Sequence, residues 1–208
     1  MTIHTRRFGR RTAASLGGLA VTVVAASTGL TGMASAAAAP GFLAAKHLPP
    51  HPSSSWTADR VTAGLPDPVP FCFDGELPDG DSTWYREFRT DLDTNAVQTT
   101  VVTPSAAAAR ALAAELNEAM TRCAAEVEQN PELTADWKDY GSLDVEEGAD
   151  VYGVHVASDW GAADIHLFSV GRDGNTVTVV RWGQLGDFGD APVAAFKKTT
   201  TIAVNRLY

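Results

Sequence analysis

Cysteine is scarce in this sequence, which has only Cys72 and Cys123 among its 208 residues. A mini-protein held together by several disulfide bonds is therefore excluded, and the length fits one domain that buries a hydrophobic core of its own. Two cysteines in an exported chain most simply form one disulfide bond. We predict a Cys72–Cys123 bond, because both residues lie in apolar stretches and no other cysteine competes with them.

Positive charge is also in short supply, with 16 Lys and Arg residues against 25 Asp and Glu residues. After position 36 the imbalance grows to 12 of those cations against all 25 acids, a formal net charge of -13. Binding to nucleic acid needs clustered cations that face the phosphates. We therefore expect no nucleic-acid partner, and the acidic excess serves either solubility or a recognition surface.

The familiar sequence signatures of catalysis are missing as well. The chain has no G-x-S-x-G elbow, no H-E-x-x-H motif, no P-loop and no G-x-G-x-x-G motif. A cysteine nucleophile needs a free thiolate, which a disulfide bond between Cys72 and Cys123 would remove. The sequence therefore favours a non-catalytic protein without cofactor or bound metal.

Beyond residue 36 no apolar run approaches the roughly 20 residues that a membrane-spanning helix needs. Residues 1–36 contain four arginines and no acid, followed by a mildly apolar run and an A-S-A sequence at 34–36. This pattern is typical of a signal peptide with its cleavage site. We expect a secreted protein with no stable membrane insertion after cleavage, exported by either the general or the twin-arginine pathway.

The longest predicted element is a helix over residues 103–130. Thr103 is a candidate N-cap, Pro104 suits the first helical position, and Pro131 follows as a stop signal. Apolar residues recur at helical spacing along one side: Leu112, Leu116, Met120, Cys123 and Val127. We expect this side to face the core.

Short strands make up most of the remaining prediction. They are expected at residues 84–90, 96–103, 142–145, 151–157, 164–170 and 176–182. Residues 61–81 and the surroundings of Trp137 and Tyr140 are expected to be loops, and a C-terminal helix is expected to begin with Asp190 as its N-cap.

This order of elements predicts an α+β fold with a single antiparallel sheet of about six strands, flanked by a long central helix and a C-terminal helix. Apolar residues at both odd and even positions of the later strands indicate that both faces of the sheet are covered. Residues 37–41 are expected to form a tail, and residues 42–208 a single domain.

A candidate ligand site follows from the expected strand pairing. A two-residue turn at Asp173-Gly174 pairs His166 with Arg181, and symmetric closure of the 158–163 loop pairs His155 with His166. The three side chains would then form a row on one face and bind an anionic group. The alternative is that these side chains are merely exposed or satisfied, and a one-residue slip in register would move one of them to the opposite face.

Several features together resemble one known family, the PknH-like extracellular sensor domain. They are the run Phe42-Leu43-Ala44-Ala45-Lys46-His47-Leu48-Pro49, the tryptophan Trp56, the loop cysteine Cys72, the alanine-rich helix that carries Cys123, and a late hairpin closed by a helix. Such domains occur on actinobacterial receptor kinases and as free-standing exported or lipid-anchored proteins. The resemblance implies a central antiparallel sheet flanked by helices, a cleft for an unidentified ligand, and no catalysis.

This chain departs from that family in two respects. Family members commonly have two disulfide bonds, whereas Cys72 and Cys123 can make only one, and no kinase domain or membrane span accompanies them. The favoured function is thus a secreted binding module of sensor type, which binds an unknown small molecule or envelope ligand. Two alternatives remain, a hydrolase or metal-dependent enzyme that uses His155 and His166, and an envelope protein or protein-binding inhibitor that uses the acidic surface.

Overall fold

The computed structural model describes residues 39–208, so the signal peptide predicted for residues 1–36 lies outside the described part. Its helices are η1 (Ala45–His47) and η2 (Phe71–Phe73), which are 3-10 turns, and the α-helices α1 (Ala106–Val127) and α2 (Val193–Asn205). Its strands are β1 (Thr57–Ala58), β2 (Thr62–Ala63), β3 (Thr83–Arg89), β4 (Asn95–Val102), β5 (Leu133–Leu143), β6 (Ala149–Ser158), β7 (Ala163–Asp173) and β8 (Thr176–Leu185).

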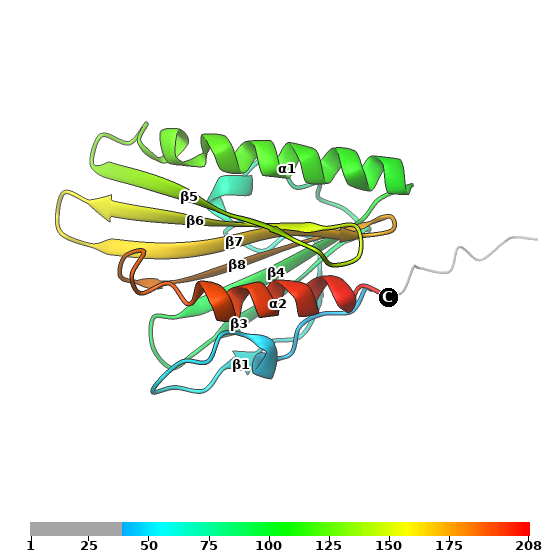
Figure 1. Cartoon of the computed structure of the whole chain (residues 1–208), viewed down its shortest axis with the longest axis horizontal. Coiled ribbons are helices and arrows are strands. Elements are labelled where there is room, and N and C mark those ends of the chain that lie inside the picture. The colour runs from blue at the N-terminus through cyan, green and yellow to red at the C-terminus, as the bar shows by residue number, and fades with distance from the viewer. Residues whose placement is uncertain (1–38) are drawn as a thin grey trace, which may run out of the picture. The chain divides into compact units, whose positions relative to one another are not determined.

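The described strands form one antiparallel sheet in the order β1-β3-β4-β8-β7-β6-β5, with β2 also paired to β3 (Figure 1). The predicted α+β class is confirmed. Strands β3 to β8 and the two α-helices follow one another in the predicted order, and the two-residue strands β1 and β2 add to the roughly six strands that were expected. The chain crosses from β4 to the far edge of the sheet through α1 and returns to β4 with β8.

Each face of the sheet is covered by one long helix. In β7 the side chains of Phe168 and Val170 belong to the core beneath α1. Those of Ile165 and Leu167, at positions of the other parity, belong to the core that contains Phe196 of α2. Because successive side chains of a strand point to opposite faces, the two helices lie on opposite sides of the sheet, as the apolar pattern predicts.

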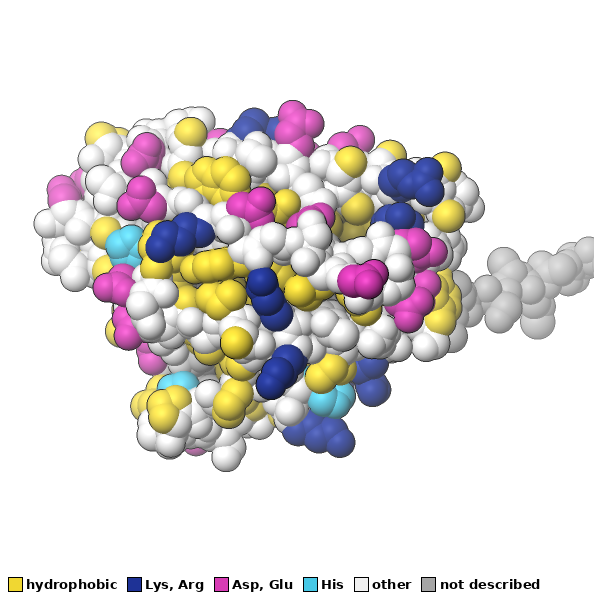
Figure 2. Space-filling view, in the orientation of Figure 1, with side chains coloured by type: hydrophobic (Ala, Val, Ile, Leu, Met, Phe, Trp, Pro, Cys, Tyr) yellow, Lys and Arg dark blue, Asp and Glu magenta, His cyan; other side chains and the backbone are white. Residues whose placement is uncertain are grey.

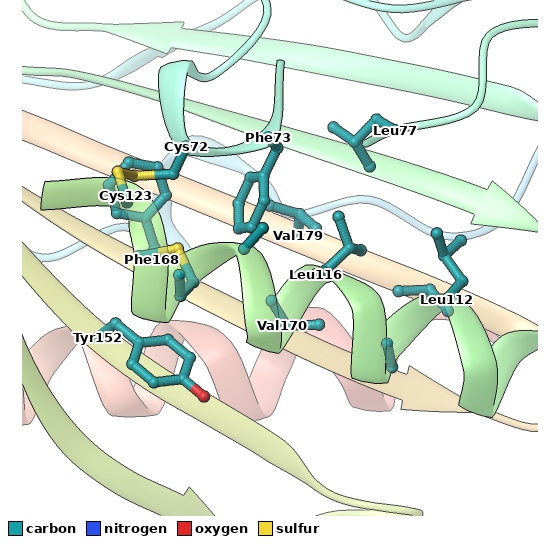
Figure 3. Close-up of a cluster of buried hydrophobic side chains, with 14 of the residues drawn as sticks. Cys72, Phe73, Leu77, Leu112, Leu116, Cys123, Tyr152, Phe168, Val170 and Val179 are labelled. Carbon is teal, nitrogen blue, oxygen red and sulfur yellow. A yellow bond between two sulfur atoms is a disulfide. The ribbon is translucent and has the colours of Figure 1, made fainter. Parts of the chain in front are cut away.

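The apolar stripe predicted for the long helix faces the core. Leu116 and Met120 are fully buried, Leu112 and Cys123 are nearly so, and Val127 packs at the margin of the same cluster. Figure 3 shows Leu112 and Leu116 of α1 directed toward the strands, with Val170 and Val179 in the same cluster. This face therefore provides much of the hydrophobic stabilisation of the fold.

Both predicted helix N-caps are wrong. The α1 cap is Ser105, whose hydroxyl accepts a hydrogen bond from the Ala108 amide at 3.2 Å, while Thr103 bonds to the Asn175 carbonyl instead. Helix α2 begins after Pro192, and the Asp190 carboxylate accepts a hydrogen bond from the Asp187 amide within the preceding loop. In both cases the polar side chain is bonded outside the helix, Thr103 to a residue 72 positions away and Asp190 to one within the same loop.

Strand β5 corrects the prediction of a loop around Trp137 and Tyr140. It extends the predicted strand 142–145 backwards to Leu133 and pairs with β6, with an irregularity between Asp139 and Ser142. Most of its side chains are exposed because it is an edge strand of the sheet. An exposed edge strand needs no apolar alternation, so its sequence lacks the period-2 signal that marks half-buried strands.

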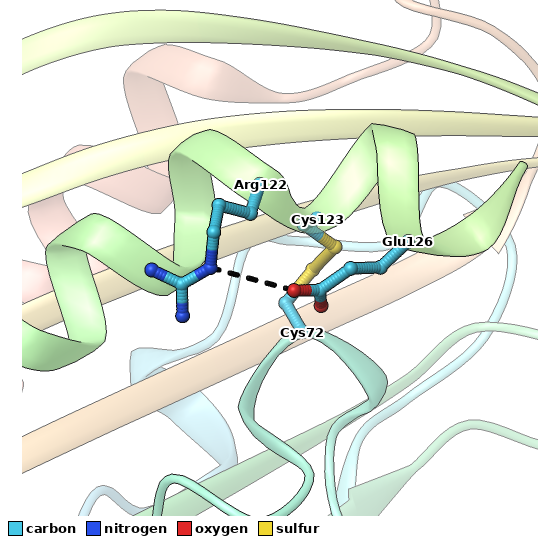
Figure 4. The surroundings of a disulfide bond; sticks show 4 residues. All are labelled: Cys72, Arg122, Cys123 and Glu126. Carbon is cyan, nitrogen blue, oxygen red and sulfur yellow. Dashed lines mark hydrogen bonds and ion pairs between the residues drawn. A yellow bond between two sulfur atoms is a disulfide. The ribbon is translucent and has the colours of Figure 1, made fainter. Parts of the chain in front are cut away.

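The predicted disulfide bond is present. Cys72 in η2 is bonded to Cys123 in α1, with their α-carbons 5.1 Å apart. Figure 4 shows the bond beside the ion pair of Arg122 and Glu126, which are 3.5 Å apart. The bond fastens the proline-rich segment before η2 to the long helix.

On the face shown in Figure 2, acidic and basic side chains alternate with exposed apolar ones, and neither sign forms a continuous stripe. Within residues 39–208 no helix has the length and apolar character needed to cross a membrane.

Truncation of Leu116 tests the packing of α1. Leu116 is fully buried, so Leu116→Ala should lower the free energy of unfolding by about 2–5 kcal/mol, as other large-to-small core changes do. Urea unfolding measures the change. The neighbouring exposed position provides the control, since Glu115→Ala should stay within about 0.5 kcal/mol of the wild type. A similarly small effect of Leu116→Ala would mean that the buried face is assigned wrongly.

Removal of the disulfide bond should also destabilise the fold. The two cysteines are 51 residues apart, for which the loss of chain entropy in the unfolded state predicts a stabilisation of about 4 kcal/mol. The double variant Cys72→Ala, Cys123→Ala should lose about this amount in urea unfolding. Thiol titration of the denatured wild type without reductant should find no free sulfhydryl, and a count of two would refute the bond.

Candidate functional site

The register between β7 and β8 moves Arg181 from its predicted partner. Asp173 pairs with Thr176, so the two-residue turn consists of Gly174 and Asn175, one residue later than predicted. Gly174 has a φ of +54°, which glycine adopts without steric strain. The shift places Arg181 opposite Phe168 and His166 opposite Gly183.

A second shift, between β6 and β7, overturns the predicted row of three side chains. The turn spans residues 158–162, and the Ser158 amide donates to the Ala162 carbonyl at 2.8 Å. His155 therefore pairs with Ile165 rather than His166, and a slip of one residue moves it to the opposite face. His155 lies on the α2 side, where its ring is 5.8 Å from that of Phe188.

His166 and Arg181 remain on the same face and lie side by side. A β-carbon added to Gly183 would come within 2.4 Å of His166 Nδ1 and 3.4 Å of Arg181 Nη2. Both side chains thus occupy the space that the missing side chain of Gly183 leaves free. The structure brings these two predicted site residues together and separates them from His155.

Two aromatic rings pack against His166. Its ring lies 5.0 Å from that of Phe71 and 6.3 Å from that of Phe168, and within residues 39–208 its Nδ1 atom has no hydrogen-bond partner. Burial, and then the positive charges of Arg181 and His155, lower the pKa of His166 to about 3. His166 is neutral above that pH and supplies no positive charge, which corrects its predicted role in anion binding.

Arg181 lines a cavity of about 380 Å³ between the sheet and the proline-rich segment that precedes the disulfide bond. One wall is apolar and comes from that segment: Pro66, Pro68, Val69, Pro70 and Phe71. The other wall is the sheet, with residues of β3, β4 and β8: Glu87, Phe88, Arg89, Asn95, Ala96, Val97 and Arg181. Asp59 completes the lining.

The charged side chains of this pocket differ in how they are compensated. Arg89 and Asp59 form an ion pair with each other. Arg181 donates from Nη1 to the neutral amide oxygen of Asn95, and among the described residues neither Arg181 nor Glu87 forms an ion pair. Burial lowers the pKa of Arg181, whereas the negative charge of the Asp164 carboxylate, which forms no ion pair with it, raises this pKa. The pocket therefore holds a half-buried guanidinium without a bonded counter-charge.

Local sequence patterns indicate Arg181 but not the other charged residues of the pocket. Pairing within the β3–β4 hairpin follows from local signals and places Glu87 opposite Val97. Nothing local indicates that β8 lies on the other side of β4, where Val97 pairs with Arg181. Glu87 and Arg89 thus lie on the same wall of the pocket as Arg181 because of one long-range strand pairing, and Asp59 reaches the site through its ion pair with Arg89.

The histidine pair proposed for an enzyme is not a single site, because His155 and His166 lie on opposite faces of the sheet. Across residues 39–208 no group of three or more His, Cys, Asp or Glu side chains is arranged to hold a metal ion.

A scan against protein-family models finds no match for this chain, and a search of curated proteins finds none either. The resemblance to the PknH-like sensor domain stays a prediction.

Acid should weaken the fold through His166. Its pKa is about 3 in the folded protein against an ordinary value of 6.5, so between these pH values the unfolded chain binds a proton that the folded protein does not. The free energy of unfolding must then fall as the pH drops from 6.5 toward 3, by at most about 1.4 kcal/mol per pH unit. Well above pH 6.5 His166 is neutral in both the folded and the unfolded state, so it does not change the pH dependence of the free energy of unfolding there.

The variant His166→Phe tests this dependence, since phenylalanine keeps an aromatic ring beside Phe71 and Phe168 but cannot titrate. Urea unfolding at pH 7, 6, 5 and 4 should show a smaller decline in stability for the variant than for the wild type. Equal declines for the two proteins would show that His166 does not have the lowered pKa described above.

Proposed function

We propose that the protein is an exported, non-catalytic binding module of the extracellular sensor type, which holds a small ligand in the pocket beside β4 and β8. The observation that carries this proposal is the environment of the Arg181 guanidinium. Its guanidinium is half-buried in a cavity, bonded to the neutral Asn95 amide, and without an ion pair among the described residues. Removing a charge from water is unfavourable unless a partner compensates it, and an anionic group of a ligand would do so.

The dimensions and lining of the pocket support a small-molecule ligand. A cavity of about 380 Å³ lies at the lower end of the range of roughly 300–1,000 Å³ found for ligand sites. Its apolar wall of prolines and Phe71 faces a sheet wall with a few polar groups, the usual combination of contact area and orienting contacts. The guanidinium can present two parallel N–H donors to a carboxylate or phosphate.

The same lining favours binding over catalysis. The described residues around the pocket include no serine, threonine, cysteine, histidine or lysine, so no hydroxyl, thiol or amine nucleophile lies beside its carboxylates Asp59 and Glu87. Nearby His166 is covered by Phe71 and neutral at ordinary pH. The pocket thus offers charge, shape and apolar contact, which suffice for recognition.

Arg181→Gln tests this function. Non-denaturing mass spectrometry of the wild type, purified from the culture supernatant of its own host, should detect a co-purifying small molecule. Loss of a charge-assisted hydrogen bond removes about 1.5–3 kcal/mol, so the variant should bind that molecule at least roughly tenfold more weakly. The exposed Lys198 of α2, the helix on the opposite face of the sheet, provides the control, since Lys198→Gln should retain the molecule. Equal retention by Arg181→Gln, or no bound molecule in the wild type, would contradict the proposal.

A further inference from the structure

The charges that line the pocket balance one another, although the chain as a whole is acidic. Two cations, Arg89 and Arg181, face two carboxylates, Asp59 and Glu87. Arg89 and Asp59 compensate each other in an ion pair. One cation and one carboxylate, Arg181 and Glu87, are left without an ion-pair partner among the described residues.

Strand pairing fixes where these two side chains lie. Glu87 of β3 pairs with Val97 of β4, and Val97 pairs in turn with Arg181 of β8. Paired residues of antiparallel strands point to the same face, so Glu87 and Arg181 flank Val97 on the pocket side of the sheet. Two strand spacings separate their backbones, roughly 10 Å.

A simple anion would satisfy only half of this arrangement. Its negative charge would bind Arg181 but would leave the carboxylate of Glu87 without a counter-charge. A ligand with a positive group at its other end would instead compensate Glu87. Between the two charged ends it would contact the apolar floor of Val97 and the opposite wall of Pro66 and Val69.

We infer that the pocket takes a short peptide with both termini free, its carboxylate on Arg181 and its ammonium group on Glu87; this inference rests on the proposed function. The length of such a peptide agrees with the separation of Glu87 and Arg181 across the sheet. An extended dipeptide spans about 7 Å, which suits two long side chains that reach toward it from backbones roughly 10 Å apart. A single α-amino acid carries its two charged groups on one carbon atom and spans much less of that distance.

Isothermal titration with three probes tests the inference: alanyl-leucine, its N-acetyl derivative and its C-terminal amide. Alanyl-leucine should bind the wild type, and capping either terminus should weaken binding at least tenfold. Acetylation should cause no further loss in Glu87→Gln, and amidation should cause none in Arg181→Gln, because each variant already lacks the partner of the capped group. Glu87 is exposed, so Glu87→Gln is expected to fold normally, and the exposed Glu115 provides the control variant Glu115→Gln.

The outcomes separate this inference from the function on which it rests. Equal binding of alanyl-leucine and its N-acetyl derivative would overturn the role of Glu87 and leave the anion site at Arg181 standing. Failure of all three probes, with a co-purifying molecule that still depends on Arg181, would overturn the peptide ligand alone. Failure of the probes together with no dependence on Arg181 would overturn both.

Discussion

The pairing of β4 with β8 is the contact on which the rest of the structure depends. It joins the early hairpin to the strands that follow α1, and it brings Val97 beside Arg181 across more than eighty residues of sequence. A buried polar network holds its register. The side-chain amide of the fully buried Gln98 accepts a hydrogen bond from the Leu43 amide at 2.8 Å and donates one to the Thr178 hydroxyl at 3.0 Å. A slip along the strand would leave these buried groups without partners, which is costly.

The disulfide bond contributes to the pocket as well as to stability. Cys72 directly follows the wall segment that ends at Phe71, and its bond to Cys123 fastens that segment to α1. Phe71 itself packs edge-on against the rings of His166 and Phe168, at 5.0 and 5.3 Å. A covalent tie and aromatic packing thus hold a loop wall that has little regular structure of its own. A wall ordered in advance lowers the entropy lost when a ligand binds.

The two faces of the sheet differ in how completely they are covered. The face beneath α2 is a closed apolar core, with Phe196 and Trp182 among its members. The face beneath α1 is covered by an apolar core along most of its length. The pocket lies where the proline-rich segment, rather than α1, covers this face. Arg181 and His166 lie at this transition, where burial lowers the pKa of both. Desolvation therefore acts on the two side chains at the boundary between core and pocket.

The sequence by itself determined the α+β class, the order of the main elements, the inner side of α1 and the single disulfide bond. These follow from apolar periodicity and from the small number of cysteines, both of which are local or countable. The tertiary structure alone decided the edge strand β5, the helix caps and the composition of the candidate site. A two-residue turn displaced by one position moved Arg181 from His166 to Phe168, and a one-residue slip sent His155 to the other face. Strand register is set by packing and hydrogen bonding between distant segments. Because side chains alternate between faces, an error of one residue in the predicted register places a side chain on the wrong face of the sheet, and composition cannot correct that error.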